Sequence, residues 1–300
     1  MRGRAVGECD LAHAPQSGAA PHVASVRWPV PALTDQDGAP LIDSTVPHSA
    51  RIFDFWLGGK DHFDVDRSAG ERVLATFPAM TELARCSRQF VGRAVRYLVE
   101  EEGVRQFLDV GTGLPTAGNT HEVAQQLAPD SRIVYVDNDP LVLAHAGEVL
   151  TCSPEGAADY LHADAHDPDR ILAEASRTLD LDKPVAVMLM GVLAHIDRYD
   201  VARAIVHRLM QDLPVGSCLA IRDGTDTDEA YKTAMREYGE SGAVPYRLRS
   251  PEEITRFFSG LELVDPGVVP CPLWRPYPDG PVAASGAAVP VLGGVARKLR

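Results

Sequence analysis

Short apolar runs alternate with amphipathic segments along most of this chain. The continuous apolar stretches at Phe107–Leu108, Ile133–Val136 and Pro184–Met190 predict buried strands, because a strand of a parallel sheet is covered on both faces. Between Phe77 and Gly103 the apolar side chains instead recur at helical spacing. This alternation of strand and helix patterns predicts an α/β fold built on a parallel sheet.

The same periodicities predict the remaining elements. Further strands are expected at Asp159–Ala163, Ser217–Ile221, Leu261–Val264 and Gly294–Lys298, and helices at Pro140–Leu150, Pro168–Leu179, Tyr199–Leu213 and Asp228–Gly239. The string Ser250-Pro251-Glu252-Glu253 predicts a capping box at the start of a short helix. The proline-rich stretch Pro266–Pro290 predicts a long surface loop. Five alternating strand–helix units and a terminal strand pair indicate a seven-stranded, mostly parallel sheet with helices on both faces.

The turn after the first strand carries the clearest chemical signal. The strand ends on Asp109, and Gly111, Thr112 and Gly113 follow. Glycine lets a backbone approach a ligand closely, since it has no Cβ and adopts positive φ without strain. Asp137 ends the second strand 24 positions after Gly113, near the ~20 expected for an acid that binds ribose hydroxyls. The unit therefore predicts a site for a nucleoside-bearing cofactor at the carboxyl ends of the strands.

Two details favour S-adenosylmethionine over a dinucleotide as that cofactor. A dinucleotide fingerprint needs a third glycine, and this chain has Thr116 in its place. Asp109 would also repel a pyrophosphate over the turn, whereas the amino group and sulfonium of S-adenosylmethionine suit an acidic strand end. An NAD(P)-dependent oxidoreductase and a non-catalytic S-adenosylmethionine-binding protein on the same fold are the alternatives.

Three strings of the sequence resemble those of one family. They are STVPHSARIFDFWLGGKDHFDVDR at Ser44–Arg67, FLDVGTGLPT at the glycine turn and VYVDNDPLVLAHA at the second strand. With the GGVARK ending, they are similar to an actinobacterial family of S-adenosylmethionine-dependent methyltransferases, formerly a domain of unknown function. The resemblance runs from about Ile42 to Arg300. It implies a Rossmann-like class I methyltransferase fold and S-adenosylmethionine as cofactor, but no known substrate.

The resemblance also implies roles for the acids at the strand ends. Asp109 would contact the cofactor amino group directly or through water, Asp137 the ribose hydroxyls and Asp164 the adenine amino group. For Asp109 the alternative is a buried acid that serves only the local turn. For Asp137 and Asp164 the alternative is a plain helix cap before the next proline. The full expected set of cofactor-binding residues is Asp109, Gly111, Thr112, Gly113, Asp137, Asn138, Asp164, Ala165, Lys60 and Arg51.

The segment Arg51–Asp61 is expected to be a mobile lid, ordered by the cofactor. Lys60 or Arg51 would meet the methionine carboxylate, and Gly58-Gly59 would admit a close approach. The alternative is a helix and turn whose charges pair with one another. The resemblance departs from the family at Phe53 and Phe55, where tyrosines are common.

The resemblance also makes His195 the candidate catalytic residue, because it lies just beyond the apolar strand Val185–Met190, where methyltransferases often place a catalytic or substrate-contacting residue. A histidine there can remove a proton from an oxygen or nitrogen nucleophile, although a helix cap or a solvent-facing histidine is the alternative. His48 is a second candidate base.

Four aromatic residues are candidates for an apolar substrate pocket, although such residues more often fill a core: Phe53, Phe55, Trp56 and Trp274. A metal site is not expected, since no second ligand cluster accompanies His162, Asp164, His166 and Asp167.

Composition limits the partners of the chain. With a net charge of −13, 45% hydrophobic and 24% charged residues, it is typical of a globular enzyme and has no basic footprint for nucleic acid. The longest apolar run, Val185–Ala194, is too short to span a membrane. Five scattered cysteines and no apparent signal peptide predict reduced thiols and a cytoplasmic protein. The expected partner is a small-molecule methyl acceptor, and the sequence assigns neither its identity nor an oligomeric state.

The domain organisation is expected to have three parts. Residues 1–40 mix Gly, Ala, Pro and His without periodicity, which predicts a disordered arm. Residues 41–104 are expected to form an N-terminal helical lid segment. Residues 105–300 are expected to form the class I methyltransferase domain.

Overall fold

The computed structural model describes residues 42–115, 118–142, 152–277 and 289–299. The chain divides into two units, Met1–Ala39 and Pro40–Arg300, and the elements below belong to the second. The disordered arm expected at residues 1–40 lies outside the described residues. Most of the helix expected at Pro140–Leu150 also lies outside them.

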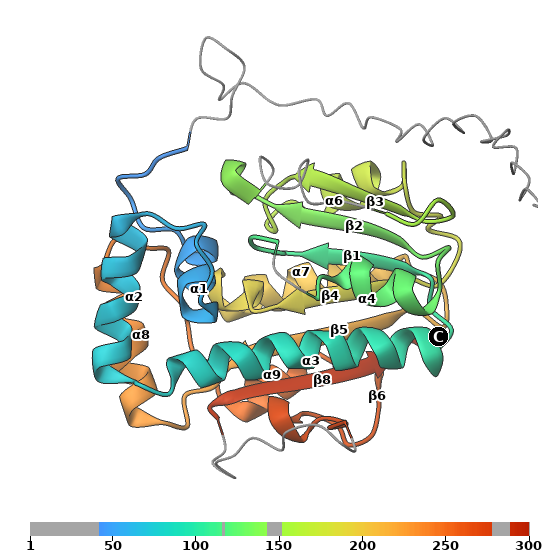
Figure 1. Cartoon of the computed structure of the whole chain (residues 1–300). Coiled ribbons are helices and arrows are strands. Elements are labelled where there is room, and N and C mark those ends of the chain that lie inside the picture. Colours follow the sequence, from blue (N-terminus) through green and yellow to red (C-terminus); the bar gives the residue numbers. More distant parts are fainter. Residues whose placement is uncertain (1–41, 116–117, 143–151, 278–288, 300) are drawn as a thin grey trace, which may run out of the picture. The chain divides into compact units, whose positions relative to one another are not determined.

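A mixed sheet forms the centre of the second unit (Figure 1). Its strands are β1 (Gln106–Val110), β2 (Arg132–Asp137), β3 (Ala157–His162), β4 (Ala186–Met190), β5 (Cys218–Gly224), β6 (Glu262–Leu263), β7 (Val269–Pro270) and β8 (Val291–Arg297). Their order is β3-β2-β1-β4-β5-β8-β6, with β7 paired to β8 beside this path. The first five strands are parallel, and β8 runs antiparallel to β5. The five parallel strands therefore end at one edge of the sheet.

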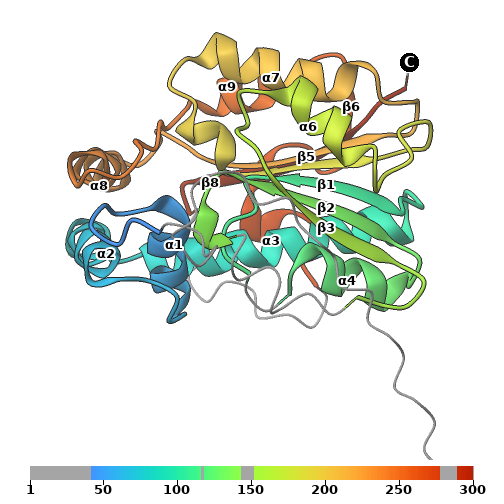
Figure 2. The same cartoon turned by 90° about the horizontal axis from the view of Figure 1, so that it is seen from above.

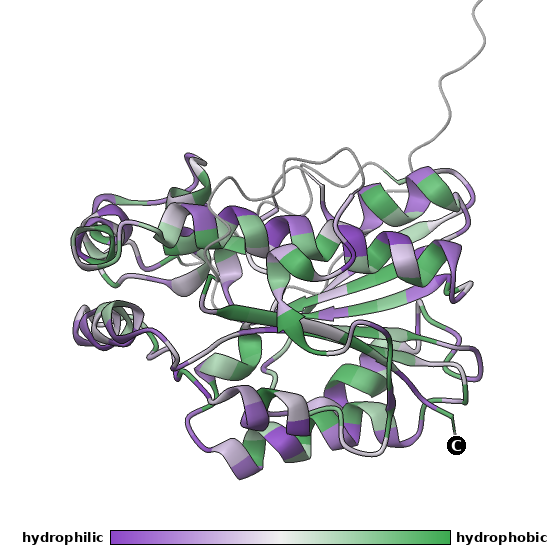
Figure 3. Ribbon diagram, turned by 90° about the horizontal axis from the view of Figure 1, so that it is seen from below, coloured by the Kyte–Doolittle hydropathy of each residue, from purple (hydrophilic) through white to green (hydrophobic). Residues whose placement is uncertain are grey.

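Strand register brings the acids predicted from the sequence to that edge. Asp109 pairs with Tyr135, and Asp137 pairs with His162. All five residues of β1 are buried, as are the last five of β2, which confirms the expectation that these apolar runs are covered on both faces. In Figure 3 the central strands are mainly green, and the helices on either side carry the purple positions.

Helices cover both faces of the sheet (Figure 2). One face carries α3 (Met80–Glu100) and α4 (Thr120–Leu127), and the other carries α6 (Pro168–Ala175), α7 (Tyr199–Gln211) and α9 (Pro251–Arg256). Three more lie beyond the carboxyl ends of the parallel strands: α1 (Ser49–Leu57), α2 (Asp64–Thr76) and α8 (Glu229–Glu240). Two 3-10 turns are η1 (Val192–His195) and η2 (Cys271–Leu273). Within the described ranges, no helix has the length and apolar character needed to cross a membrane.

The α/β architecture is confirmed, and the strand count exceeds the expected seven by one. The extra strand is β7, which lies in the stretch expected to be a loop; it has two residues and pairs only with β8. β5 continues past its expected end at Ile221 to Gly224. The expected capping box is confirmed, because Ser250 Oγ accepts from Glu253 N at 3.2 Å and Glu253 Oε2 accepts from Ser250 N at 3.0 Å.

A buried carboxylate joins α1 to α2. Asp66 is fully buried and accepts hydrogen bonds from the backbone amides of His48 and Phe63, each at 2.8 Å. Its Oδ2 also lies 3.4 Å from Nε of Arg51, whose other guanidinium nitrogens donate to two backbone carbonyls that precede α1. α3, by contrast, contacts β4, β5 and β8. In the expected lid segment, α1 and α2 therefore stand beyond the sheet edge, whereas α3 covers the sheet.

The end of β5 carries a buried ion pair. Oδ2 of the fully buried Asp223 lies 3.3 Å from Nη1 of Arg249. Arg249 also donates to the Ile196 carbonyl at 2.9 Å, and Tyr246 donates its hydroxyl to Asp223 at 3.0 Å. Burial raises the pKa of Asp223 to about 6, against the lowering effects of Arg249 and Arg222. This pair ties the segment that follows α8 to the sheet edge.

We expect Arg249→Met to destabilise the fold by about 3–5 kcal/mol, because the Asp223 carboxylate would stay buried without its partner. Arg247→Met is the matched control, since Arg247 pairs with Asp197 at 2.7 Å on the exposed surface. Loss of such an exposed pair changes stability by about 1 kcal/mol or less. Urea unfolding measures both variants. Equal unfolding midpoints for the two variants would contradict a special role of the buried pair.

Candidate functional site

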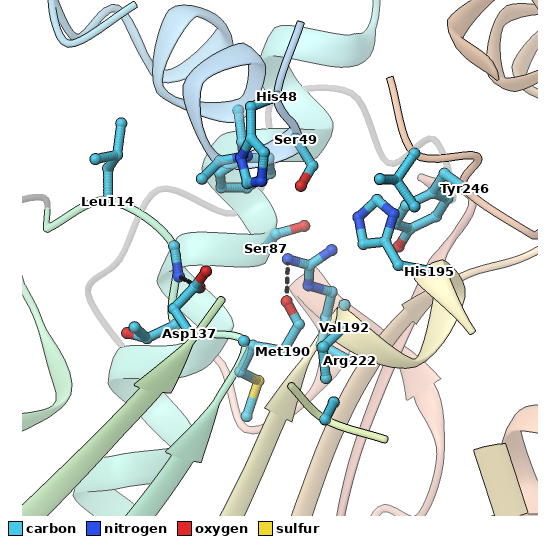
Figure 4. A pocket seen from close by; sticks show the side chains of 18 of the residues that line it. His48, Ser49, Ser87, Leu114, Asp137, Met190, Val192, His195, Arg222 and Tyr246 are labelled. Carbon is cyan, nitrogen blue, oxygen red and sulfur yellow. Dashed lines mark hydrogen bonds between the residues drawn. The ribbon is translucent and has the colours of Figure 1, made fainter. Parts of the chain in front are cut away.

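A cavity of about 370 Å³ lies at the carboxyl ends of β1, β2, β4 and β5 (Figure 4). Residues at and after these strand ends line it, together with residues of α1, α3 and the segment from α8 onward. The volume falls within the range of about 300–1,000 Å³ that is common for small-molecule sites. α1 closes one side of the cavity, in the position expected of a lid.

The glycine turn after β1 lines the cavity. Gly111 and Gly113 adopt φ of +74° and +68°, which favours glycine at both positions. A Cβ on Gly111 would lie 2.4 Å from Cβ of Val192, so this glycine is also required by the packing of η1. A Cβ on Gly113 would meet only Ala50 of α1, at 3.9 Å. Gly113 is therefore the position where the missing side chain leaves space between the turn and α1.

Asp137 joins the glycine turn to the end of β2. Its Oδ2 accepts from the Gly113 amide at 2.8 Å, and its Oδ1 accepts from the Asp139 amide at 3.0 Å. Burial raises the pKa of Asp137, while these two backbone hydrogen bonds lower it. A carboxylate can accept about four hydrogen bonds. Two acceptor positions are therefore left for a ligand in the cavity that this residue lines.

Asp109 lies behind the cavity and is not among its lining residues. Its Oδ2 accepts from Thr120 Oγ1 at 2.7 Å, at the start of α4. Burial raises the pKa of Asp109 to about 6, although the Thr120 hydrogen bond and the Arg88 guanidinium lower it. The carboxylate faces α4, as the alternative of a buried acid with a local role requires, and the expected contact with a cofactor amino group, directly or through water, stays a prediction.

The expected residues after β2 and β3 reach the cavity. Asn138, Asp164 and Ala165 all line it. Asp164 Oδ1 lies 2.7 Å from His166 Nδ1 and 2.9 Å from the His166 amide. Partial burial raises the pKa of Asp164, but the hydrogen bonds from His166 outweigh it and hold that pKa below its usual value. In the described part of the chain, no group of three or more potential ligands could hold a metal ion.

The structure does not bring the two expected cations to the cavity. Lys60 is exposed, and Arg51 is engaged by Asp66 beneath α1. The paired glycines also serve the local fold, because a Cβ on Gly59 would lie 1.8 Å from Oδ1 of Asp54. Arg51 thus pairs with a buried acid of α2 and not with a charge of its own segment.

His195 lines the cavity at the end of η1. Its Nδ1 lies 3.3 Å from the Pro245 carbonyl, and its ring packs edge-on to Tyr246 with centroids 5.2 Å apart. A carbonyl only accepts hydrogen bonds, so we assign the proton to Nδ1, which leaves Nε2 as an acceptor. Burial lowers the pKa of His195 to about 4; His48 and Arg222 act in the same direction, and the contact with the Pro245 carbonyl opposes them. The ring is therefore neutral at neutral pH.

His48 links α1 to the segment that follows β2. Its Nδ1 lies 2.9 Å from Oδ2 of Asp139, two residues after Asp137. The same nitrogen lies 3.3 Å from the Ala50 amide. One nitrogen cannot donate to the carboxylate and accept from the amide at once, and the shorter contact to a charged group is the stronger. His48 is thus engaged in positioning α1.

The four aromatic candidates divide into two pairs. Phe53 and Trp56 of α1 line the cavity. Phe55 does not, and it packs against the ring of His62 at 5.3 Å. Trp274 is fully buried in the core, where its ring meets Phe90 of α3 edge-on. The substrate-pocket interpretation is therefore retained for Phe53 and Trp56 only.

Two arginines on the cavity wall were not predicted from the sequence. Arg88 of α3 donates to Asn119 Oδ1 at 2.7 Å, and Arg222 of β5 donates to the Met190 carbonyl at 2.7 Å. Nothing in the helical pattern distinguishes Arg88 from a surface arginine. The signal for Arg222 was its place after the apolar run of β5, because ligands of α/β sheets bind at the carboxyl ends of strands.

Comparisons with known proteins give a consistent result. A family model described as S-adenosyl methyltransferase matches residues 35–299. A DUF574 family protein from Streptomyces avermitilis is 43% identical, with 86% of this chain and 100% of that chain covered and a TM-score of 0.82. A presumed methyltransferase from Thermobifida fusca is 39% identical, with 91% and 99% covered and a TM-score of 0.79. No curated protein matches.

Proposed function

The chain belongs to the S-adenosyl methyltransferase family, and on this basis we propose that its cavity holds S-adenosylmethionine beside a small-molecule methyl acceptor. One observation carries the proposal. The Gly111–Gly113 turn and Asp137 line the β1–β2 side of the cavity, and His195 lines the side beyond β4. Family membership identifies the chain as an S-adenosylmethionine-dependent methyltransferase, in preference to a nicotinamide-dependent oxidoreductase.

The residues on the β1–β2 side fit the cofactor. The two free acceptor positions of Asp137 would receive the ribose hydroxyls, and Asp164 with Ala165 would border the adenine. Gly113 leaves room for the chain of the amino acid part between the turn and α1. Asp109 acts indirectly, by holding the start of α4 through Thr120. When bound, S-adenosylmethionine supplies a methyl group attached to a positively charged sulfur. The leaving group of the transfer is a neutral thioether.

The chain's own contribution to the reaction is alignment and proton removal. A lone pair on the acceptor oxygen or nitrogen would form the new bond to the methyl carbon that the cofactor supplies, and the electrons of the broken carbon–sulfur bond would remain on sulfur. His195 Nε2 takes the proton that the acceptor loses, because Nδ1 donates to the Pro245 carbonyl. Holding the reactants in line in an enclosed site supplies much of the rate.

A small acceptor suits the enclosure of the site. α1 and the segment after α8 close over the strand ends, and the net charge of −13 disfavours a polyanion as partner. We also place the reaction in the cytoplasm. The cysteines of the described residues, Cys86, Cys152, Cys218 and Cys271, are free thiols, as is usual in a reducing compartment.

We expect Asp137→Asn to weaken S-adenosylhomocysteine binding roughly 10- to 100-fold, because a hydrogen bond to a charged group contributes about 1.5–3 kcal/mol. Calorimetry on the folded variant measures the effect. Asp130→Asn is the matched control, since Asp130 faces solvent and pairs with Arg105 at 3.6 Å. Unchanged affinity in Asp137→Asn would exclude the ribose role. Failure of the wild-type protein to bind S-adenosylhomocysteine would refute the proposed function itself.

We expect His195→Gln to lower kcat by about 10²–10⁴-fold and to leave S-adenosylhomocysteine affinity unchanged, since only proton removal is lost. Transfer of label from methyl-labelled S-adenosylmethionine to a panel of small molecules detects turnover and then compares the variants. His207→Gln, at an exposed position on α7, is the control. Wild-type turnover in His195→Gln would remove this residue from the mechanism.

The pH dependence of kcat/KM follows from the pKa of His195, which burial lowers to about 4. The base form is the neutral ring, so it is fully present above this pKa and is lost as pH falls through it. We therefore expect no change in kcat/KM from His195 between pH 6 and 8, and a fall only near the pKa. A decline centred near 6.5 would indicate an ordinary exposed histidine.

We expect hydrogen exchange across residues 44–67 to slow when S-adenosylhomocysteine is added, because α1 lines the cavity and a ligand beneath it holds it in place. Residues 251–256, which form α9, provide the internal control. Lys60→Ala should retain wild-type affinity, since Lys60 is exposed and outside the cavity. Identical exchange with and without ligand would show α1 to be rigid scaffold and not a mobile lid.

A further inference from the structure

Arg222 is a buried cation that forms no ion pair within the described residues, although from a longer distance its charge lowers the pKa of its neighbour Asp223. It is 8% exposed, and no carboxylate in the described part of the chain lies within ion-pair distance of it. Nη2 donates to the Met190 carbonyl at 2.7 Å, but the buried Nε makes no hydrogen bond there. The neighbouring Asp223 is already paired with Arg249. A buried charge left this way is unfavourable unless something else compensates for it.

The fold makes room for this guanidinium. Gly191, at the end of β4, has φ of +105°, and a Cβ there would lie 2.9 Å from Nη1 of Arg222. Figure 4 shows Arg222 reaching up into the cavity, with Ser87 on one side and His195 on the other. The ring of Phe53 lies under the cation at 5.6 Å, which offsets part of its desolvation.

The position of Arg222 in the sheet separates it from Asp137, the acid proposed to bind the cofactor. Arg222 lies on β5, and Asp137 lies on β2, with β1 and β4 between them. At about 4.8 Å per strand, the two backbones are about 14 Å apart. Arg222 therefore belongs to the half of the cavity that also holds His195.

The walls around Arg222 are apolar and aromatic. Phe53, Tyr238, Met235, Val244 and Tyr246 line this part of the cavity. A guanidinium forms two parallel hydrogen bonds with a carboxylate, which is the anion that best matches its planar fork. A ligand that matches both the apolar walls and the guanidinium of Arg222 has an aromatic or apolar body and one carboxylate.

We propose that Arg222 binds the carboxylate of an acidic, largely aromatic methyl acceptor, whose body lies against Phe53 and Tyr246. This inference rests on the proposed function, because it assigns the acceptor half of the same cavity. It names the chemical class of the substrate and gives Arg222 the role of fixing the acceptor beside His195.

Benzoate and its neutral isostere benzamide test the proposal. Calorimetry with the wild-type protein saturated with S-adenosylhomocysteine should show benzoate binding roughly 10- to 100-fold more tightly than benzamide, the range for one charge-assisted contact. This comparison needs no variant and therefore no assumption about folding. Equal binding of the two probes, or no binding of benzoate, would overturn the proposal.

Three variants then test whether the preference for benzoate over benzamide depends on Arg222. Arg222→Met keeps most of the side-chain volume and should abolish the preference for benzoate, whereas Arg222→Lys should retain part of it and Arg247→Met all of it. S-adenosylhomocysteine affinity should be unchanged in Arg222→Met. A loss of that affinity would mean that the guanidinium holds the cofactor carboxylate, and the proposal would be wrong. If the wild-type protein binds no S-adenosylhomocysteine, the proposed function fails as well; if it binds but shows no benzoate preference, only the acceptor assignment fails.

Discussion

The hydrogen bond from the Gly113 amide to the Asp137 carboxylate is the contact around which the site is organised. It joins the turn after β1 to the end of β2, two neighbouring parallel strands that must end at the same edge of the sheet. The same carboxylate accepts from Asp139, whose own side chain meets His48 at the start of α1. One buried acid thus connects two strands and, through its neighbour, the helix that closes the cavity. These backbone hydrogen bonds to Asp137 matter because a buried carboxylate without hydrogen-bond partners is strongly unfavourable.

Strand order gives the cavity two chemically different halves. The β1–β2 half contains Asp137 and the glycine turn, which suit hydroxyl and amino groups. The half beyond β4 contains the buried Arg222 and the neutral His195. A cationic cofactor and an acidic acceptor would then meet near the middle of the sheet edge, each held by groups of opposite charge or by neutral acceptors. Solvent exclusion by α1 strengthens every one of these interactions.

The string that marks the family at the N-terminal end acts chiefly as scaffold in this structure. Arg51 is held by Asp66, and Gly59 makes room for Asp54. What α1 presents to the cavity is instead its small and aromatic side, including Ala50, Phe53 and Trp56. In this string Arg51 and Gly59 therefore help to anchor the covering helix, whereas Asp54, Phe53 and Trp56 line the cavity.

The sequence by itself determined the α/β class, the parallel strands and the position of Asp137, because these follow from local periodicity and from turn residues at fixed offsets. It also singled out the turn and, through the family resemblance, His195, and both line the cavity at the strand ends. Only the tertiary structure decided that Arg51, Lys60 and Asp109 lie off the cavity and that Arg222 lies on it. The charged pair Arg222-Asp223 resembles a strand end in the sequence, yet β5 continues through both residues to Gly224, and the buried Asp223 pairs with Arg249, which is distant in the chain. Which charges pair with each other is set by contacts between segments far apart in sequence, and no local pattern contains that information.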